Sequence, residues 1–250
     1  MKAIIELENR TVQIDLADPI DISIPLQHGL SNPNCFFAPP PEIWPVRTDS
    51  FVGLVKEGSP VNFQNLKVNP HGNGTHTECV GHISAEARTI NQCLKRFHFL
   101  GQLVSIYPQK SVNGNKVIRQ DLLSSLLGPH PAPAVIIRTL PNDDSKLSRQ
   151  YSGSHPPFFA PEAINWLVEK GVQHLLTDLP SVDPEEDGGA LAAHRAFWQY
   201  PKSIRQEATI TELIYVPEVV ADGYFVLNLQ ICSLEMDASP SKPILYRIDS

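Results

Sequence analysis

The chain has 250 residues, of which 42% are hydrophobic and 19% charged, a composition that fits a folded globular protein and excludes a disordered one. Its formal net charge of -7 argues against a nucleic-acid partner, because no basic stripe is available to bind phosphates, and favours a small-molecule substrate. Cys35, Cys79, Cys93 and Cys232 form no CxxC pair, and eighteen apolar residues never run together. We therefore expect a cytoplasmic protein with no membrane partner, folded as one domain over residues 1–250.

The first elements predicted are the two strands of a hairpin. Apolar residues alternate or cluster over residues 3–7 and 11–16, with a turn at Asn9-Arg10 between them. Residues 19–45 follow and are rich in proline, which favours extended backbone over helix. The aromatic side chains of this extended segment indicate that it packs on another surface.

The middle of the chain alternates between helix and strand. Helices are expected over residues 85–94 and 119–127, the second with a Gly-Pro stop signal after it. Residues 133–140 form a nearly continuous apolar run that predicts a buried strand. An amphipathic helix over residues 160–170 then leads, through a glycine cap, into another strand over residues 172–177.

The order of these elements predicts an α/β fold. Asp178 follows the last of the strands above, and the carboxyl ends of strands in such folds commonly bind ligands. The chain from Thr209 onward is β-rich, with turns expected at Gly223 and at Ser239-Pro240.

A cluster of potential metal ligands is the most informative feature. Three of the nine histidines, His71, His76 and His82, fall within twelve residues, and Glu78 lies among them. Imidazole and carboxylate together suit zinc, manganese or iron. His76 and Glu78 are two residues apart, so they leave the same face of an extended segment, and Gly81 lets the backbone bend so that His82 returns to the same point. Surface or core histidines with backbone partners are the alternative, which the clustering disfavours.

The same segment resembles a family signature. Gly74-Thr75-His76, Glu78 and His82 are similar to the HxGTHxDxPxH motif of the cyclase-like metal hydrolases, a family that includes bacterial kynurenine formamidase. The resemblance implies an α/β fold with a mixed β-sheet or barrel-like core flanked by helices, the swivelling β/β/α arrangement of that family.

The segment departs from the motif at three positions, two of which are ligand positions. Glu78 stands where the family has aspartate, which lengthens the ligand arm by one methylene, and Val80 replaces the proline. Aligned without a gap, the first family histidine falls on Gly72, so His71 serves as a ligand only if the loop bulges by one residue.

A second block extends the resemblance. Residues 177–184 (TDLPSVDP) are similar to the family's DTPSVDP-like stretch, and His194 and Glu212 match a later histidine and a glutamate that bind metal in the family. Residues 14–20 are similar to its DLSHPI-like start. The implied ligand set is therefore His71, His76, Glu78, His82, His194 and Glu212, holding a divalent ion that we expect to be zinc or manganese.

The resemblance implies hydrolysis of an amide, a formamide or a cyclic amide by metal-activated water. His82 either binds metal or shuttles a proton, and Glu212 either binds metal or acts as general base. Two other functions stay open: a metal or small-molecule binding protein without catalysis, and a metal-dependent cyclase or lyase.

Aromatic residues are the candidates for binding substrate. Phe36, Phe37, Trp44 and Phe158 are predicted to form walls for a flat or aryl substrate, although core or subunit contacts explain them equally well. In the family the segment that carries the first three often lies at a dimer interface, so the resemblance implies a homodimer or a higher homo-oligomer.

Overall fold

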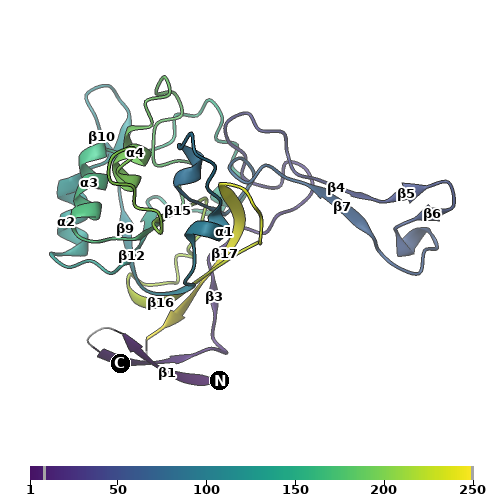
Figure 1. Cartoon of the computed structure of the whole chain (residues 1–250), viewed down its shortest axis with the longest axis horizontal. Coiled ribbons are helices and arrows are strands. Elements are labelled where there is room, and N and C mark those ends of the chain that lie inside the picture. Colours follow the sequence, from purple (N-terminus) through teal and green to yellow (C-terminus); the bar gives the residue numbers. More distant parts are fainter. Residues whose placement is uncertain (8–9, 249–250) are drawn as a thin grey trace.

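A ring of strands forms the centre of the molecule (Figure 1). The structure is a computed structural model that describes residues 1–7 and 10–248. Around the ring the order is β16 (Gly223–Ile231), β9 (His98–Ile106), β12 (Ala134–Thr139), β14 (His174–Thr177), β15 (Thr209–Glu212), β8 (His76–Glu78) and β17 (Ala238–Arg247). The ring closes because β17 also pairs with β16, and β3 (Ile20–Asp21) adds to β17. The predicted α/β fold with a mixed, barrel-like sheet is thereby confirmed.

The continuous apolar run of β12 follows from burial on both faces of the sheet. All six residues of this strand are buried, and it runs parallel to β9 and β14. Val135 and Ile137 pack with the helices outside the barrel, whereas Ala134 and Ile136 pack in its interior. Side chains alternate between the two faces, so the four consecutive apolar residues Ala134 to Ile137 fill both cores.

Helices cover the outer face of the barrel on one side (Figure 1). These are α2 (Gln120–Leu127), α3 (Pro161–Glu169) and α4 (Ala192–Trp198), and each adds buried apolar residues to the core outside the sheet. The helices predicted over residues 119–127 and 160–170 are confirmed. None of the helices in the described ranges is long and apolar enough to cross a membrane.

Two predicted elements were wrong in extent. The helix expected over residues 85–94 is only the four-residue α1 (Ile90–Cys93), because Thr89 and Gln92 form a reciprocal capping box that starts the helix at Ile90. The turn expected at Ser239-Pro240 lies inside β17, paired with Thr77 and His76 of β8. Pairing of this part of β17 with β8 overrides the local turn propensity.

Two hairpins extend from the barrel (Figure 1). The predicted N-terminal hairpin is confirmed as β1 (Lys2–Leu7) paired with β2 (Arg10–Asp15), although Asn9 of its expected turn lies outside the described residues. The second hairpin, which we call the arm, comprises residues 42–67. It is formed by β4 (Glu42–Pro45) and β7 (Gln64–Lys67), with β5 (Arg47–Thr48) and β6 (Phe51–Val52) near its tip. A small sheet elsewhere joins β10 (Gln109–Lys110), β11 (Lys116–Ile118) and β13 (Phe158–Phe159).

Candidate metal centre

The predicted ligands of β8 lie on the outer face of the barrel, under helix α4. His76 pairs with Glu212 of β15, and Glu78 pairs with Ile210. Paired residues project from the same face of a sheet, and Ile210 belongs to the core that includes the helices. His76, Glu78 and Glu212 therefore face α4, which carries His194.

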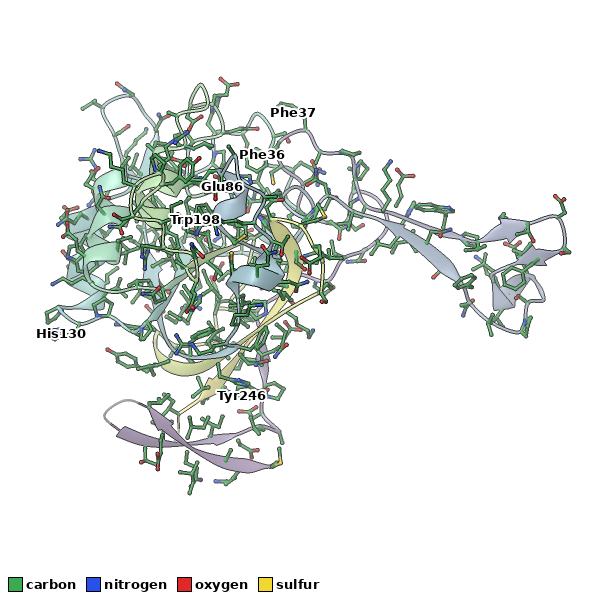
Figure 2. All side chains as sticks on the ribbon, viewed as in Figure 1. Phe36, Phe37, Glu86, His130, Trp198 and Tyr246 are labelled. Atoms are coloured by element: carbon green, nitrogen blue, oxygen red, sulfur yellow. The ribbon has the colours of Figure 1, made fainter. Side chains whose placement is uncertain are left out.

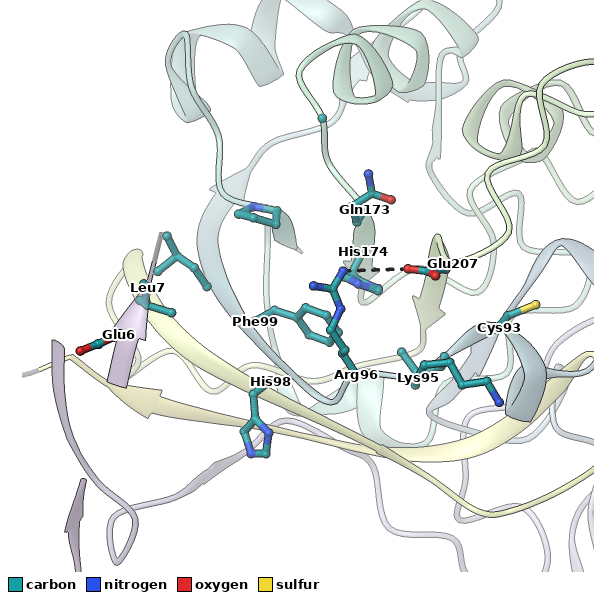
Figure 3. Close-up of a pocket in the computed structure, with 14 residues that line it drawn as sticks. Glu6, Leu7, Cys93, Lys95, Arg96, His98, Phe99, Gln173, His174 and Glu207 are labelled. Atoms are coloured by element: carbon teal, nitrogen blue, oxygen red, sulfur yellow. Dashed lines mark ion pairs between the residues drawn. The ribbon is translucent and has the colours of Figure 1, made fainter. Parts of the chain in front are cut away.

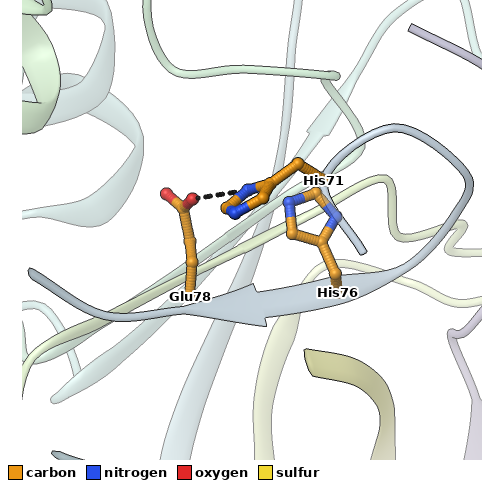
Figure 4. Close-up of side chains that lie close together, drawn as sticks. All are labelled: His71, His76 and Glu78. Atoms are coloured by element: carbon orange, nitrogen blue, oxygen red, sulfur yellow. Dashed lines mark ion pairs between the residues drawn. The ribbon is translucent and has the colours of Figure 1, made fainter. Parts of the chain in front are cut away.

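Glu78 lies at the centre of the cluster and is fully buried. Its Oε1 is 3.1 Å from His194 Nε2, and its Oε2 is 3.2 Å from His71 Nδ1 and 3.9 Å from His82 Nδ1. Figure 4 shows Glu78 of β8 and His71 of the preceding loop facing each other, with His76 of β8 beside His71. The longer arm of glutamate thus places both carboxylate oxygens among histidine nitrogens.

The loop before β8 brings His71 inward despite its displacement in the sequence. The rings of His71 and His76 are 5.2 Å apart, centroid to centroid. Two glycines make this path possible: a Cβ at Gly72 would lie 2.3 Å from the Cβ of Ala38, and Gly74 has a φ of +155°. His71 therefore lies beside His76 and Glu78, which is the arrangement that the predicted one-residue bulge required.

His194 is held by a buried carboxylate that also caps its helix. Asp183 accepts hydrogen bonds from the backbone N–H of Ala193 at 2.7 Å and of His194 at 3.0 Å. The same carboxylate is 2.6 Å from Nδ1 of His194, which leaves Nε2 directed at Glu78. The ring of Trp198, one turn later, stacks on His194 with centroids 5.6 Å apart. Capping and stacking together fix the orientation of this imidazole.

His76 and Glu212 face each other on neighbouring strands. The Oε2 atom of Glu212 is 3.4 Å from Nε2 of His76, and its Oε1 accepts the backbone N–H of Val182 at 3.0 Å. Nδ1 of His76 is 2.9 Å from the carbonyl oxygen of Gly74. Each residue is thus oriented by the backbone on one side and directed into the cluster on the other.

Asp237 belongs to the cluster and was missed by the sequence reasoning. It immediately precedes β17, and its Oδ2 is 2.8 Å from His71 Nε2 and 3.3 Å from His82 Nδ1. No local pattern identifies it, because 155 residues separate it from His82. Only the pairing of β17 with β8 brings the two together.

The donor set fits a divalent cation. Among the described residues, Nε2 of His76 and Oε2 of Glu78 are buried and have no hydrogen-bond partner, a costly arrangement unless a cation pairs with them. Three groups have donor atoms within 4.8 Å of one another: two share Glu78, with His71 and His76 or with His82 and His194, and the third joins His71, His82 and Asp237. Histidine nitrogens with carboxylate oxygens suit zinc and manganese.

The pKa shifts report how strongly charge is concentrated here. Burial lowers the pKa of His71, but the neighbouring carboxylates of Asp237 and Glu78 outweigh this and raise it to about 10. Burial likewise opposes protonation of His194, yet the charge of Glu78 and the bond to Asp183 raise its pKa to about 10. Burial raises the pKa of Glu78, but His82 and His194 hold it well below its usual range. Glu78 therefore stays ionised and attracts positive charge, and binding of a metal here would release the protons of His71 and His194.

Asp178, predicted to lie at a ligand-binding strand end, is instead part of a closed ion pair. Nζ of the buried Lys146 is 2.7 Å from Oδ2 of Asp178 and 2.6 Å from the carbonyl oxygen of Thr139. The backbone N–H of Thr139 donates to the same carboxylate at 2.9 Å. The Asp178 carboxylate therefore links the end of β14 to Thr139 at the end of β12, and its charged partner is Lys146.

The predicted aromatic walls lie at different places. Phe36 and Phe37 are exposed, and both have positive φ, in the loop that leads to the arm (Figure 2). Trp44 is half-exposed on β4 of the arm. Phe158 is partly buried against the core that includes the helices. Their role in binding substrate stays a prediction.

A separate cavity of about 740 Å³ lies at the opposite end of the parallel strands. Figure 3 shows it lined by Phe99 and by His174, which begins β14, and by Lys95 and Arg96, with Glu207 facing Arg96. Its lining contains none of the metal-cluster residues.

Comparison with known proteins identifies the family. The Cyclase family matches residues 14–184, more than half of the chain. The chain belongs to the cyclase family. The matched span of this cyclase-family protein contains the segment from His71 to His82 and Asp183, but His194 and Glu212 lie beyond it. Their place in the cluster rests on the structure.

Solved structures share the fold at low sequence identity. One is described as a potential metal-dependent hydrolase with cyclase activity; it is 16% identical with a TM-score of 0.67, over 93% of this chain and 99% of that chain. Isatin hydrolase A from Labrenzia aggregata, bound to benzyl benzoate, is 12% identical with a TM-score of 0.67, over 93% and 94% of the two chains. An isatin hydrolase bound to the product analogue thioisatinate is 14% identical with a TM-score of 0.64, over 93% of each chain.

Proposed function

We propose that this cyclase-family protein is a metal-dependent hydrolase that cleaves the carbon–nitrogen bond of an amide, a formamide or a cyclic amide. The observation that carries the proposal is the buried Glu78, whose two oxygens lie among histidine nitrogens while Oε2 has no hydrogen-bond partner. The similarity to isatin hydrolases supports the substrate class, because isatin is a cyclic amide.

The chain's own residues divide between holding the metal and moving protons. His71, His76 and Glu78 form one group of donors, and His82 and His194 form a second with the same glutamate. When bound, zinc or manganese would activate water and polarise the substrate carbonyl. His82 is partly exposed and lies at the edge of the cluster, so it is the residue placed to exchange protons with solvent. Glu212 is buried against His76, which favours a role in holding the metal.

The test is hydrolysis by the protein loaded with zinc or with manganese. An aryl formamide and isatin are incubated with wild type, with wild type plus chelator, and with Glu78→Gln, and the products are weighed by mass spectrometry. From isatin we expect one ring-opened product heavier by one water, and from the aryl formamide an aryl amine and formate whose summed mass is that of the substrate plus one water, formed only by the loaded wild type. Stoichiometric metal without turnover of any amide would instead support a binding protein, and a product of unchanged mass would support a cyclase.

We further propose that the small-molecule hydrolase is a homodimer formed through the arm. Trp44, Val55, Val61, Phe63 and Leu66 are all exposed on this hairpin. Exposed apolar side chains gathered on one projecting element are typical of a protein–protein interface. Light scattering after gel filtration should give twice the chain mass for wild type. A double variant, Phe63→Ser with Leu66→Ser, should give the mass of a single chain, and a monomeric wild type contradicts the proposal.

The cytoplasmic location stays a prediction.

A further inference from the structure

The two nitrogens of His71 face two different carboxylates. Nδ1 is 3.2 Å from Oε2 of Glu78, and Nε2 is 2.8 Å from Oδ2 of Asp237. Binding of a metal would release one proton from His71, and the neutral imidazole that results has one N–H and one lone pair, whereas an ionised carboxylate can only accept. The closer carboxylate, Asp237, therefore takes the N–H of Nε2. The Nδ1 lone pair then faces a buried carboxylate oxygen that has no hydrogen-bond partner, and a cation between them resolves that conflict.

The two buried histidines of the cluster, His76 and His194, follow the same plan with their nitrogens exchanged. His76 has Nδ1 on the carbonyl oxygen of Gly74, and His194 has Nδ1 on Asp183, so each directs Nε2 into the cluster. His71 instead has its outer partner on Nε2 and directs Nδ1 inward. This reversal accompanies the displacement of His71 by one residue from the family position. Asp237 thus holds His71 as Asp183 holds His194.

The position of Asp237 is fixed by the fold. Its carbonyl oxygen accepts the backbone N–H of Cys79, the residue after Glu78, at 3.0 Å. The next residue, Ala238, pairs with Glu78 across β17 and β8. The carboxylate is therefore anchored to the same strand that carries the central glutamate, and it reaches His71 from the side opposite Glu78.

We propose that Asp237 is a positioning residue of the metal centre, which accepts the Nε2–H of His71 and thereby directs Nδ1 of His71 at the metal. This inference rests on the proposed metal centre, although it does not depend on which substrate is hydrolysed. Outer carboxylates of this kind fix the tautomer of a ligating histidine, and their loss typically weakens metal affinity by about 10-fold to 100-fold.

Metal affinity is the first test, measured by competition with a chromogenic chelator for zinc and for manganese. We expect Asp237→Ala to bind both ions about 10-fold to 100-fold more weakly. Asp237→Asn should retain most of the affinity, because its amide oxygen can accept the same hydrogen bond. The matched control is Glu235→Ala, since Glu235 precedes β17 by a few residues and bonds only to Thr89 and Asn91 among the contacts found. Wild-type affinity in Asp237→Ala overturns the proposal.

The second test reads the tautomer in the folded wild type, so it holds even where a variant fails to fold. Two-bond ¹H–¹⁵N correlation spectra of the zinc-loaded protein should place the proton of His71 on Nε2, with His71→Gln used for assignment. A proton on Nδ1 overturns the proposal. Asp237-dependent metal affinity without hydrolysis of any amide would refute the proposed function alone, whereas hydrolysis with an affinity indifferent to Asp237 would refute this inference alone.

Discussion

Replacing Asp183 with asparagine should weaken both the fold and the metal centre. The carboxylate accepts two backbone N–H groups at the start of α4, from Ala193 and His194, and also holds the His194 ring at 2.6 Å. Asparagine has one carbonyl oxygen and one NH₂ group, so on one side a donor must face a donor. Asp183 is buried, so water cannot satisfy the group left without a partner.

The magnitude follows from the number and kind of bonds lost. Losing one hydrogen bond to a charged group and leaving a buried donor unsatisfied should cost about 3 kcal/mol in the free energy of unfolding. For a chain of this length that corresponds to a Tm about 6 to 12 °C lower. Because His194 also loses its fixed tautomer, metal affinity should fall by about 10-fold to 100-fold.

Thermal unfolding of the metal-free protein and chelator competition measure the two effects separately. The control is Asp187→Asn in the same loop: Asp187 accepts the backbone N–H groups of Gly189 and Leu191 but has no bond to a histidine among the contacts found. We expect this control to lower the Tm less and to leave the affinity unchanged. The reasoning is refuted if Asp183→Asn binds zinc and manganese as tightly as wild type.

Three further predictions concern the metal and the buried histidines. Mass spectrometry should show that His76→Ala and His194→Ala each lose bound metal, whereas the control His98→Ala, at an exposed position, keeps it. Wild-type metal stoichiometry in both cluster variants would contradict the proposed site. Chelator should lower the Tm of wild type and added zinc or manganese restore it, because ligand binding stabilises only the folded state; an unchanged Tm would speak against a structural contribution of the metal. Burial and two nearby arginines lower the pKa of His174 from 6.5 to about 3, so between these pH values only the unfolded state takes up the proton. As pH falls below 6.5, the free energy of unfolding of metal-free wild type should therefore decrease more steeply than that of His174→Asn, by up to about 1.4 kcal/mol per pH unit. Urea unfolding at a series of pH values measures the difference, and parallel pH profiles for the two proteins would rule it out.

Local patterns predicted the elements whose ends are marked by their own residues. The helix α3 has proline at its first position and Gly171 just past its C-cap, and β12 begins with four consecutive apolar residues because both its faces are buried. The prediction was wrong where other contacts decide the structure. A reciprocal cap at Thr89 shortens the predicted helix, and pairing with the distant β8 places Pro240 in a strand where a turn was predicted.

The sequence by itself determined the near members of the metal cluster. His76 and Glu78 share a face because side chains alternate along a strand, and the family resemblance added His194 and Glu212. The sequence left open whether His71 reaches the cluster, because that depends on the path of the loop through Gly72 and Gly74.

Only the tertiary structure decided which side chains complete the cluster and which do not. Asp237 joins it because closure of the barrel lays β17 along β8. Asp178, expected at a ligand-binding strand end, pairs with Lys146 instead. Both outcomes depend on contacts between distant parts of the chain. A carboxylate's role is set by the nearest charge in three dimensions, and the spacing of residues along the sequence does not contain that information.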